Sequence, residues 1–218
     1  MKTAPSEAPQ GCISVIDDDP ELCRSIGSLL RAMGYEVRLF GCTRDFLAAP
    51  PPGPTGCLLL DIRLSGENGL DFQEELNALP EAMPVILMTG HGDIPMTVRG
   101  MRAGAIDVLP KPFDEDQLLE AISAALEADA ELRAQAALLA GLQRRYDQLT
   151  PRERQVMALV VTGLMNKQVA AHLELSEITV KIHRGNVMRK MAAQSLADLV
   201  RMAEQLGVRD ATISRYSI

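Results

Sequence analysis

The chain has 218 residues, 47% of them hydrophobic and 23% charged, which is enough for two small domains and ordinary for a globular protein. No apolar run approaches the roughly 18 to 20 residues of a membrane span, and residues 1–11 lack the hydrophobic core of a signal peptide. The four scattered cysteines include no CxxC pair and are interpreted as buried, reduced thiols. These features predict a cytoplasmic protein that does not bind a membrane.

The net charge of −7 argues by itself against a nucleic-acid partner, but the charge is unevenly distributed. Residues 1–148 hold 12 Lys and Arg against 23 Asp and Glu, a balance of −11. Residues 149–218 hold 10 against 6, a balance of +4. An acidic first part and a basic last part indicate separate functions, and the basic part suits contact with phosphates.

Short β-rich runs alternate with helical patterns between residues 12 and 127. The apolar runs are nearly continuous, as expected for strands of a parallel sheet that is covered on both faces. Right-handed crossovers then predict an α/β doubly wound five-stranded parallel sheet. The predicted strands are 12–16, 35–40, 57–62, 85–90 and 105–109, and the predicted helices are 20–33, 43–49, 69–79, 95–103 and one that begins near Asp114.

The segment 114–148 contains no proline and a single glycine, Gly141, and it predicts one long helix that leaves the α/β domain. Several apolar residues follow coiled-coil spacing over fewer than three heptads, so a coiled coil and a solvated linker helix are equally compatible with the pattern. These residues are Leu132, Leu139, Leu142, Tyr146 and Leu149. The predicted domains are residues 12–127, a helical linker 128–148, and residues 149–218.

Short helices with clear start signals follow Thr150. Thr150 and Glu153 match a capping box with a proline at the first helical position, and Ser195 and Asp198 match a second one. The last part of the chain is therefore expected to be a compact all-α, four-helix domain. Its predicted helices are 151–162, 166–173, 177–191 and 196–206.

Polar side chains follow the predicted strands at the edge where ligands bind in a doubly wound sheet. They are Asp17 and Asp18 after the first strand, Asp61 after the third, Thr89 after the fourth and Lys111 after the fifth. Crowded carboxylates repel one another unless a cation joins them, and oxygen ligands without cysteine or histidine suit Mg²⁺. A hydroxyl and an ammonium beside them would balance the oxygens of a transferred phosphoryl group. The pattern predicts phosphoryl transfer to an aspartate with Mg²⁺ as cofactor.

This set of residues, in this order along residues 12–127, resembles the signature of bacterial receiver domains, which have a flavodoxin-like fold. The resemblance implies that Asp61 is the phosphoacceptor. It also implies that Mg²⁺ binds directly to Asp18, to Asp61 and to the backbone carbonyl of Arg63. Asp17 would act on the metal mainly through water.

The same resemblance gives roles to the other polar residues. Thr89 would hydrogen-bond a phosphoryl oxygen, Lys111 would pair with it, and the peptide bond between Lys111 and Pro112 is expected to be cis. The chain departs from the receiver pattern at two positions. Val108 stands where many receivers carry Tyr or Phe, which puts the usual aromatic switch in doubt. Ser65 stands where a proline is common, so its loop is expected to be more mobile.

Residues 149–207 resemble the LuxR-type helix-turn-helix, most closely the FixJ branch of the NarL/FixJ regulators. The TPRERQV start, the GLMNKQVA helix and the TVKIHRGNVMRKM recognition helix carry this resemblance. It implies that the helix at 177–191 enters the major groove of DNA, with Val180, Val187 and Met191 in the core. The expected DNA contacts are Lys181 and Ile182 at base edges, Arg184 at a base or a phosphate, and Lys167, Thr179 and Arg189 at phosphates.

Two residues inside the predicted recognition helix are ambiguous. Gly185 costs about 1 kcal/mol of helix stability relative to alanine, which indicates a close approach to DNA or to protein. His183 is equally compatible with a structural position and with a DNA contact.

Together the two resemblances imply a response regulator transcription factor rather than an enzyme. A sensor histidine kinase would phosphorylate Asp61 in the presence of Mg²⁺. Phosphorylation would control homodimerisation and sequence-specific binding to double-stranded DNA, with RNA polymerase as a further partner. The expected dimer face combines the segment 91–103, the fifth strand and the fifth helix, near Met96, Arg99, Met101 and Val108.

Two other functions fit parts of the pattern. An aspartyl phosphatase or phosphotransferase acting on an external substrate would use the same acidic pocket, but the motif lacks a substrate-binding insertion and a second general acid. A phosphorylation-independent DNA-binding protein with a vestigial receiver would not need the complete pocket.

Activation has two alternative forms. In the first, the acidic receiver masks the basic recognition helix, and the charge asymmetry makes this docking plausible. A rigid helix at 114–148 would oppose it, whereas a bend near Gly141 and the pair Arg144-Arg145 would permit it, which slightly favours masking. In the second, dimerisation tethers two weak DNA-binding domains and raises their effective concentration.

Overall fold

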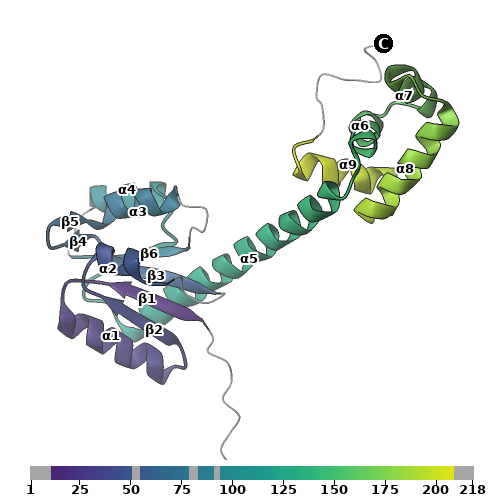
Figure 1. The fold of residues 1–218 in the computed structure, drawn as a ribbon. Coiled ribbons are helices and arrows are strands. Elements are labelled where there is room, and N and C mark those ends of the chain that lie inside the picture. Colours follow the sequence, from purple (N-terminus) through teal and green to yellow (C-terminus); the bar gives the residue numbers. More distant parts are fainter. Residues whose placement is uncertain (1–10, 51–54, 79–82, 91–93, 209–218) are drawn as a thin grey trace, which may run out of the picture. The chain divides into compact units, whose positions relative to one another are not determined.

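The computed structural model of the chain describes residues 11–50, 55–78, 83–90 and 94–208 (Figure 1). It divides into two compact units, Met1–Leu132 and Arg133–Ile218, and each has its own hydrophobic core. Among the described residues, no helix is long and apolar enough to cross a membrane.

Five strands of the first unit form one parallel sheet in the order β2-β1-β3-β6-β7. This order confirms the predicted doubly wound sheet, because the strand order reverses at β1, which lies between β2 and β3. A separate antiparallel pair, β4 with β5, was not predicted and lies directly after β3 in the chain. The strands are β1 (Cys12–Ile16), β2 (Glu36–Phe40), β3 (Gly56–Asp61), β4 (Arg63–Leu64), β5 (Glu67–Asn68), β6 (Val85–Thr89) and β7 (Asp107–Pro110).

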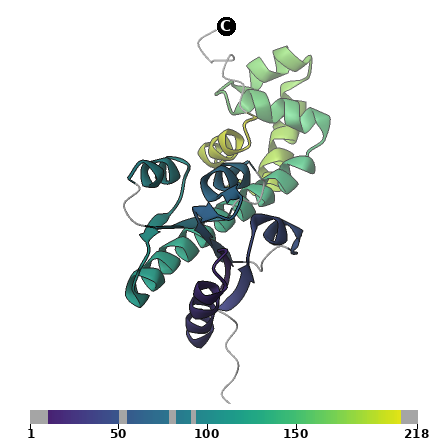
Figure 2. The ribbon, with the colours of Figure 1, turned by 90° about the vertical axis from the view of Figure 1, so that its left-hand side faces the viewer.

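Helices cover both faces of this sheet (Figures 1 and 2). Strand β3 serves both faces because its side chains alternate: Cys57 and Leu59 join the core under α1 and α5, whereas Leu58 and Leu60 join the core under the other helices. All four side chains are fully buried, and each leucine contributes about 2 kcal/mol through burial. The helices are α1 (Pro20–Ala32) and the first half of α5 (Glu115–Asp147) on one face, and α2 (Thr43–Ala48), α3 (Gly69–Asn77) and α4 (Ile94–Arg102) on the other.

The predicted start of β7 shifts by two residues, as does the predicted end of α6, from 162 to Val160. The chain leaves α4 through Gly104, whose φ of +87° lies in the left-handed region that favours glycine. The Ala105 N–H then bonds to the Gly100 carbonyl at 3.1 Å, so Ala105 completes the helix end. The strand therefore begins at Asp107 rather than at residue 105.

The cysteines agree with the predicted thiols at three of four positions. Cys12, Cys23 and Cys57 are buried, whereas Cys42, at the N-cap position of α2, is half-buried. Burial raises the pKa of Cys57 to about 12 and that of Cys23 to about 11. Both side chains are therefore uncharged and unreactive at neutral pH.

Four helices follow α5 in the described part of the second unit, as predicted. The capping box of Thr150 and Glu153 is present, and the side chains of Ser176 and Ser195 cap the last two helices. Val180, Val187 and Met191 lie in its core, which confirms their predicted positions. The helices are α6 (Pro151–Val160), α7 (Asn166–Leu173), α8 (Glu177–Met191) and α9 (Leu196–Gln205).

Helix α5 is continuous from Glu115 to Asp147, as predicted, and Gly141, where a bend would permit masking, lies within it. Buried Asp129 accepts a hydrogen bond from the Gly56 N–H at 2.9 Å, which attaches the helix to the five-stranded sheet beyond residue 127. At the other end, Tyr146 and Leu149 pack into the core of the second unit. Parts of the predicted linker 128–148 therefore pack with the units that flank it.

Candidate functional site

The predicted polar residues lie together at the carboxyl edge of the sheet. Asp17 and Asp18 follow β1, Asp61 ends β3 and Thr89 ends β6. Lys111 follows β7, and the peptide bond after it is cis, as the resemblance implied. Asp17, Asp61 and Thr89 are buried, with exposed fractions of 1%, 7% and 5%, whereas Asp18 is exposed.

Lys111 joins the two buried carboxylates. Its Nζ donates to Asp17 Oδ2 and to Asp61 Oδ2, each at 2.6 Å. Burial alone would lower the pKa of Lys111, but hydrogen bonds and charges from both aspartates outweigh it, so the pKa lies above its ordinary value. Burial raises the pKa of Asp17, and the hydrogen bond from Lys111 offsets part of that rise. The ammonium is therefore charged at neutral pH and adjacent to Asp61.

One carboxylate oxygen from each of Asp17, Asp18 and Asp61 lies within 4.8 Å of the other two. Mg²⁺ prefers such oxygen ligands and keeps several waters, so a cluster of this size fits it. With the ammonium of Lys111, the three ionised carboxylates leave a charge of −2, which one divalent cation balances. Arg63, the predicted carbonyl ligand, begins β4, and its N–H donates to Asp61 Oδ1 at 3.0 Å.

Thr89 ends β6, the strand that pairs with β3, which ends in Asp61. Its Oγ1 donates to the Gly90 carbonyl at 3.1 Å, and its own carbonyl accepts from the Lys111 N–H at 2.6 Å. Val108, in place of the common aromatic residue, is half-buried and packs against the core on the α3 side of the sheet. The Thr89 hydroxyl is therefore bonded to the main chain at the end of β6, the strand that pairs with β3.

The β4–β5 hairpin is hydrogen-bonded to the rest of the first unit at two points that the sequence did not predict. The Ser65 N–H donates to Asp18 Oδ2 at 3.1 Å, and the Ser65 hydroxyl donates to the same oxygen. Glu67 Oε2 accepts from the Thr43 N–H at 3.3 Å and from the Thr43 hydroxyl. The expectation of a more mobile loop finds no support in these contacts, which join residues 24 and 47 positions apart.

Gly69 is a second feature that the sequence did not single out. A Cβ at this position would lie 2.2 Å from the Asp61 carbonyl oxygen and 3.0 Å from the Ile62 Cα. The Gly69 N–H donates to the Ile62 carbonyl at 2.9 Å, so α3 begins directly against the end of β3. A side chain here would push on the main chain that carries Asp61.

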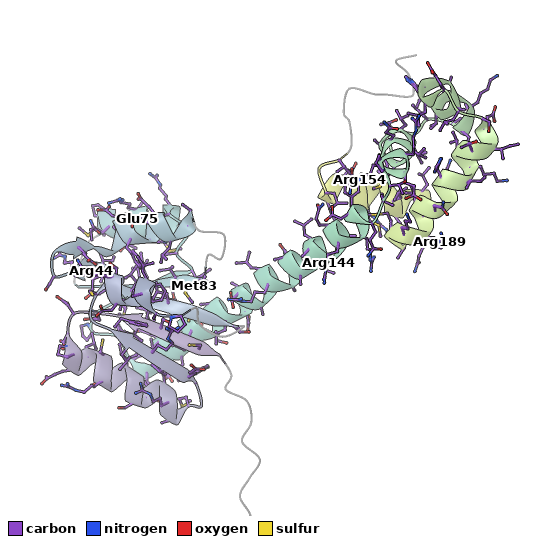
Figure 3. The ribbon with its side chains drawn as sticks, viewed as in Figure 1. Arg44, Glu75, Met83, Arg144, Arg154 and Arg189 are labelled. Carbon is purple, nitrogen blue, oxygen red and sulfur yellow. The ribbon has the colours of Figure 1, made fainter. Side chains whose placement is uncertain are left out.

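The predicted DNA-contacting residues gather on two helices of the second unit. Lys181, Ile182 and Arg189 are exposed on α8, and Lys167 is exposed near the start of α7. Figure 3 shows Arg189 on α8. Thr179, half-buried in the first turn of α8, donates its N–H to the Ser176 hydroxyl at 3.1 Å.

Three of the predicted contact residues have protein partners, and one of them is Thr179, whose hydroxyl lies 2.8 Å from that of Ser176. The Arg184 Nη1 donates to Asn166 Oδ1 at 3.1 Å, which joins α8 to the start of α7. The Arg189 Nη2 donates to Asn186 Oδ1 at 3.1 Å, within α8. Lys181 and Ile182 are therefore the most available side chains for base edges.

Models of two families match the chain, one described as "Response regulator receiver domain" over residues 13–123 and one as "Bacterial regulatory proteins, luxR family" over residues 147–203. Nodulation protein W of Bradyrhizobium diazoefficiens is 53% identical over 90% of this chain and 86% of its own length. Transcriptional regulatory protein FixJ of the same organism is 39% identical over 91% of this chain and 97% of its own length. The chain belongs to the NarL/FixJ response regulators.

The structure of response regulator StyR is similar to that of this regulator, with a TM-score of 0.77, 45% sequence identity, and coverage of 89% of this chain and 98% of the other. The NarL/FixJ regulator is thus a transcriptional regulator of a two-component system rather than an enzyme, as expected. Its receiver domain implies a histidine kinase as partner, and its LuxR-type domain implies binding to DNA. Receivers generally use Mg²⁺, and the acidic cluster of this regulator is of the matching kind.

The DNA-binding unit of the regulator also contains a buried ion pair that the sequence did not predict. Glu153 Oε2 accepts from Lys190 Nζ at 2.6 Å and from the Thr150 N–H at 2.8 Å. Glu153 is 3% exposed, and the pair joins the start of α6 to the end of α8. The capping-box signal predicted the contact with Thr150, but no local pattern points to Lys190.

Of the two alternatives for Gly185, the structure contradicts a close approach to protein and does not test a close approach to DNA. A Cβ at Gly185 would meet no heavy atom within 4 Å, so no described part of the protein approaches this glycine closely. His183 is half-buried, and its Nδ1 is buried without a hydrogen-bond partner among the described residues. These surroundings favour the structural interpretation of His183.

Proposed function

We propose that Asp61 is the phosphoacceptor of this response regulator and that Mg²⁺ is its cofactor. The observation that supports this most directly is the position of Asp61 at the end of β3, with Lys111 at 2.6 Å and two further carboxylates beside it. Asp18, Asp61 and the carbonyl of Arg63 would hold the metal, and Asp17 would act through water. Bound Mg²⁺ would offset the repulsion among the carboxylates and the charge of the phosphoryl oxygens.

The transfer forms one bond at Asp61 and breaks one bond in the donor. The Asp61 carboxylate supplies the electron pair of the new P–O bond, while the P–N bond of a phosphohistidine on the kinase breaks. The imidazole nitrogen keeps that electron pair and takes a proton from water. Lys111, which contacts Asp61 before transfer, would pair with a phosphoryl oxygen, and the Thr89 hydroxyl would leave the Gly90 carbonyl to donate to another.

The test is phosphorylation of the full-length protein by a small phosphodonor with Mg²⁺, followed by intact mass measurement. We expect the addition of one phosphoryl group, and Asp61→Asn should abolish it. Asp116→Asn, at an exposed aspartate in the first turn of α5, serves as the matched control and should be phosphorylated like the wild type. Unchanged stoichiometry in Asp61→Asn would show that the acceptor is another residue.

For the DNA-binding domain, residues 149–218, we propose that α8 reads the major groove. Two properties of the α7–α8 surface support this: the exposed cations at Lys167, Lys181 and Arg189, and the exposed apolar side chain of Ile182 beside them. Lys181 and Ile182 would contact base edges, and Arg184 a base or a phosphate. Lys167, Thr179 and Arg189 would hold the phosphates, which positions the helix without specifying sequence.

The remaining partners belong to the same proposal: a sensor histidine kinase as phosphodonor, a homodimer formed on phosphorylation, and RNA polymerase. The expected dimer face contains exposed apolar side chains on α4, with Val98 at 44% and Met101 at 47% exposure. Arg99 on that helix pairs with Asp71 and Glu74 of α3 at 2.7 and 2.8 Å, so this cation is engaged within the receiver. Residues 91–93 of the predicted face lie outside the described residues. The cytoplasmic location expected from the composition stays a prediction.

A further inference from the structure

Ser65 contacts Asp18 through two donors that converge on one carboxylate oxygen. Its N–H lies 3.1 Å from Asp18 Oδ2, and its hydroxyl donates to the same atom. Both residues are exposed, so neither is held by burial in a core. A proline at position 65 has no N–H and no hydroxyl and would make neither hydrogen bond.

The hairpin that carries Ser65 is itself held in place. Before Ser65, the Arg63 N–H bonds to Asp61 Oδ1 at 3.0 Å. After it, the carboxylate of Glu67 accepts from both the N–H and the hydroxyl of Thr43 at the start of α2. The serine donors therefore lie at a fixed place beside the acidic cluster rather than on a free loop.

The two hydrogen bonds orient Asp18 for a metal. Both fall on Oδ2, and with the side chain held in this way an oxygen of Asp18 lies within 4.8 Å of one from Asp17 and one from Asp61. An exposed aspartate without such partners must lose its rotational freedom when it binds a cation, and that loss weakens binding. Hydrogen-bond partners behind a metal ligand typically change metal affinity by about 10- to 100-fold.

We propose that Ser65 is a positioning residue for Mg²⁺: it fixes the Asp18 carboxylate in the cluster and so raises the affinity of the receiver for the metal before phosphorylation. This inference rests on the proposed magnesium site. A proline at position 65 could not position Asp18 in this way, because it would make neither hydrogen bond.

The test measures Mg²⁺ binding to the full-length protein by calorimetric titration without a phosphodonor, so the readout is independent of phosphorylation. Ser65→Ala should raise the dissociation constant for Mg²⁺ about tenfold. Ser65→Thr keeps the hydroxyl and should stay near the wild-type value. Ser28→Ala, at an exposed serine on α1, is the matched control and should have no effect. Thermal unfolding of each variant checks that the fold is retained.

A double variant tests whether Ser65 acts through Asp18. If it does, Ser65→Ala should weaken binding in the wild-type background and have no further effect in an Asp18→Asn background. Equal or tighter binding by Ser65→Ala, while the wild type binds Mg²⁺ and Asp18→Asn binds it more weakly, would overturn the inference and leave the magnesium site intact. A wild-type protein that binds no Mg²⁺ at millimolar concentration would overturn the proposed site and the inference with it.

Discussion

Glu153 combines three roles in one buried carboxylate: it caps α6, pairs with Lys190 and joins two helices of the DNA-binding unit. Glu153→Gln keeps the size of the side chain but removes the charge. Hydrogen bonds to charged groups contribute roughly 1.5 to 3 kcal/mol each, so we expect the free energy of unfolding of this unit to fall by about 2 kcal/mol at pH 7. Urea denaturation measures the change, and Glu177→Gln, at an exposed glutamate on α8, should change little.

The same contacts predict a pH dependence. Burial tends to raise the pKa of Glu153, but the hydrogen bonds from Lys190 and Thr150 outweigh it, so the folded-state pKa lies below the ordinary value of 4.5. A lowered pKa contributes stability that is complete above about pH 4.5 and is lost as the pH falls through the folded-state pKa. The difference between wild type and Glu153→Gln should therefore shrink on acidification from pH 7. A difference that stays constant would mean that the ionised carboxylate is not its source.

The sequence predicted the residues whose position follows from the topology alone. Asp17, Asp18, Asp61, Thr89 and Lys111 each follow a strand, and parallel strands bring their carboxyl ends to one edge, so the set could be placed without coordinates. Ser65 could not be placed in this way. Its contact spans 47 residues and depends on a hairpin of two-residue strands, too short to give a periodic signal.

At the scale of elements, the start of α3 is set by how closely it approaches β3. Gly69→Ala would place a Cβ 2.2 Å from the Asp61 carbonyl oxygen, and a backbone atom cannot rotate away as a side chain can. We expect a loss of about 1 to 3 kcal/mol in receiver stability, as for other overpacked sites. Because the strain falls on Asp61, phosphorylation by a small donor should also slow. Gly41→Ala, where a Cβ meets nothing within 4 Å, is the control. Normal stability and phosphorylation in Gly69→Ala would exclude this constraint.

Gly185 gives the opposite expectation for α8. Glycine inside a helix costs about 1 kcal/mol relative to alanine, and a Cβ at Gly185 would meet open space. Gly185→Ala should therefore raise the free energy of unfolding of the DNA-binding unit by up to about 1 kcal/mol. If DNA approaches this position, the more stable variant should bind DNA more weakly than the wild type. Unfolding and DNA titrations on one preparation separate the two effects. Equal DNA affinity of the wild type and Gly185→Ala would show that the glycine is not required for a close approach of DNA.

Among the elements, the helices with caps and the apolar strands were predicted within about two residues. Capping residues such as Thr150, Ser176 and Ser195 mark helix starts locally, so tertiary packing need not be known. The sequence did not predict contacts that depend on tertiary packing. The attachment of α5 to the sheet through Asp129 depends on a hydrogen bond to Gly56 across 73 residues, and no local pattern contains it.

At the scale of the whole molecule, phosphorylation should change the oligomeric state. We expect sedimentation to show a monomer without phosphodonor and a dimer with it, and Asp61→Asn should remain monomeric. Met101→Glu, which puts a charge on the exposed apolar face of α4, should be phosphorylated normally but fail to dimerise. Leu47→Glu, at an exposed leucine on α2, is the matched control. A dimer before phosphorylation would point instead to pairing through α5.

The last prediction concerns how the signal reaches DNA. Phosphorylation promotes DNA binding only if the two forms of the protein differ in their DNA-competent population. Masking supplies that difference through attraction between the acidic residues 1–148 and the basic residues 149–218. Tethering produces the same difference without any masking contact, because a phosphorylated dimer brings a second DNA-binding domain to the DNA. The two are separated by comparing an isolated DNA-binding fragment with the unphosphorylated full-length protein.

The fragment should begin before Tyr146, because Tyr146 packs into the core and the Arg145 guanidinium donates to the Met191 carbonyl at 3.3 Å. Fragment 141–218 keeps both contacts. Affinity is measured on a half-site selected from random duplexes with the phosphorylated protein. Masking requires the fragment to bind DNA more tightly than the full-length chain. The ratio of the two affinities should fall toward one as salt is added, because salt shortens the Debye length below about 8 Å, its value at physiological salt, and so screens the attraction between the acidic and basic parts. Both affinities fall with salt, so the ratio is the quantity that decides. Equal affinities at every salt concentration would leave tethering as the mechanism.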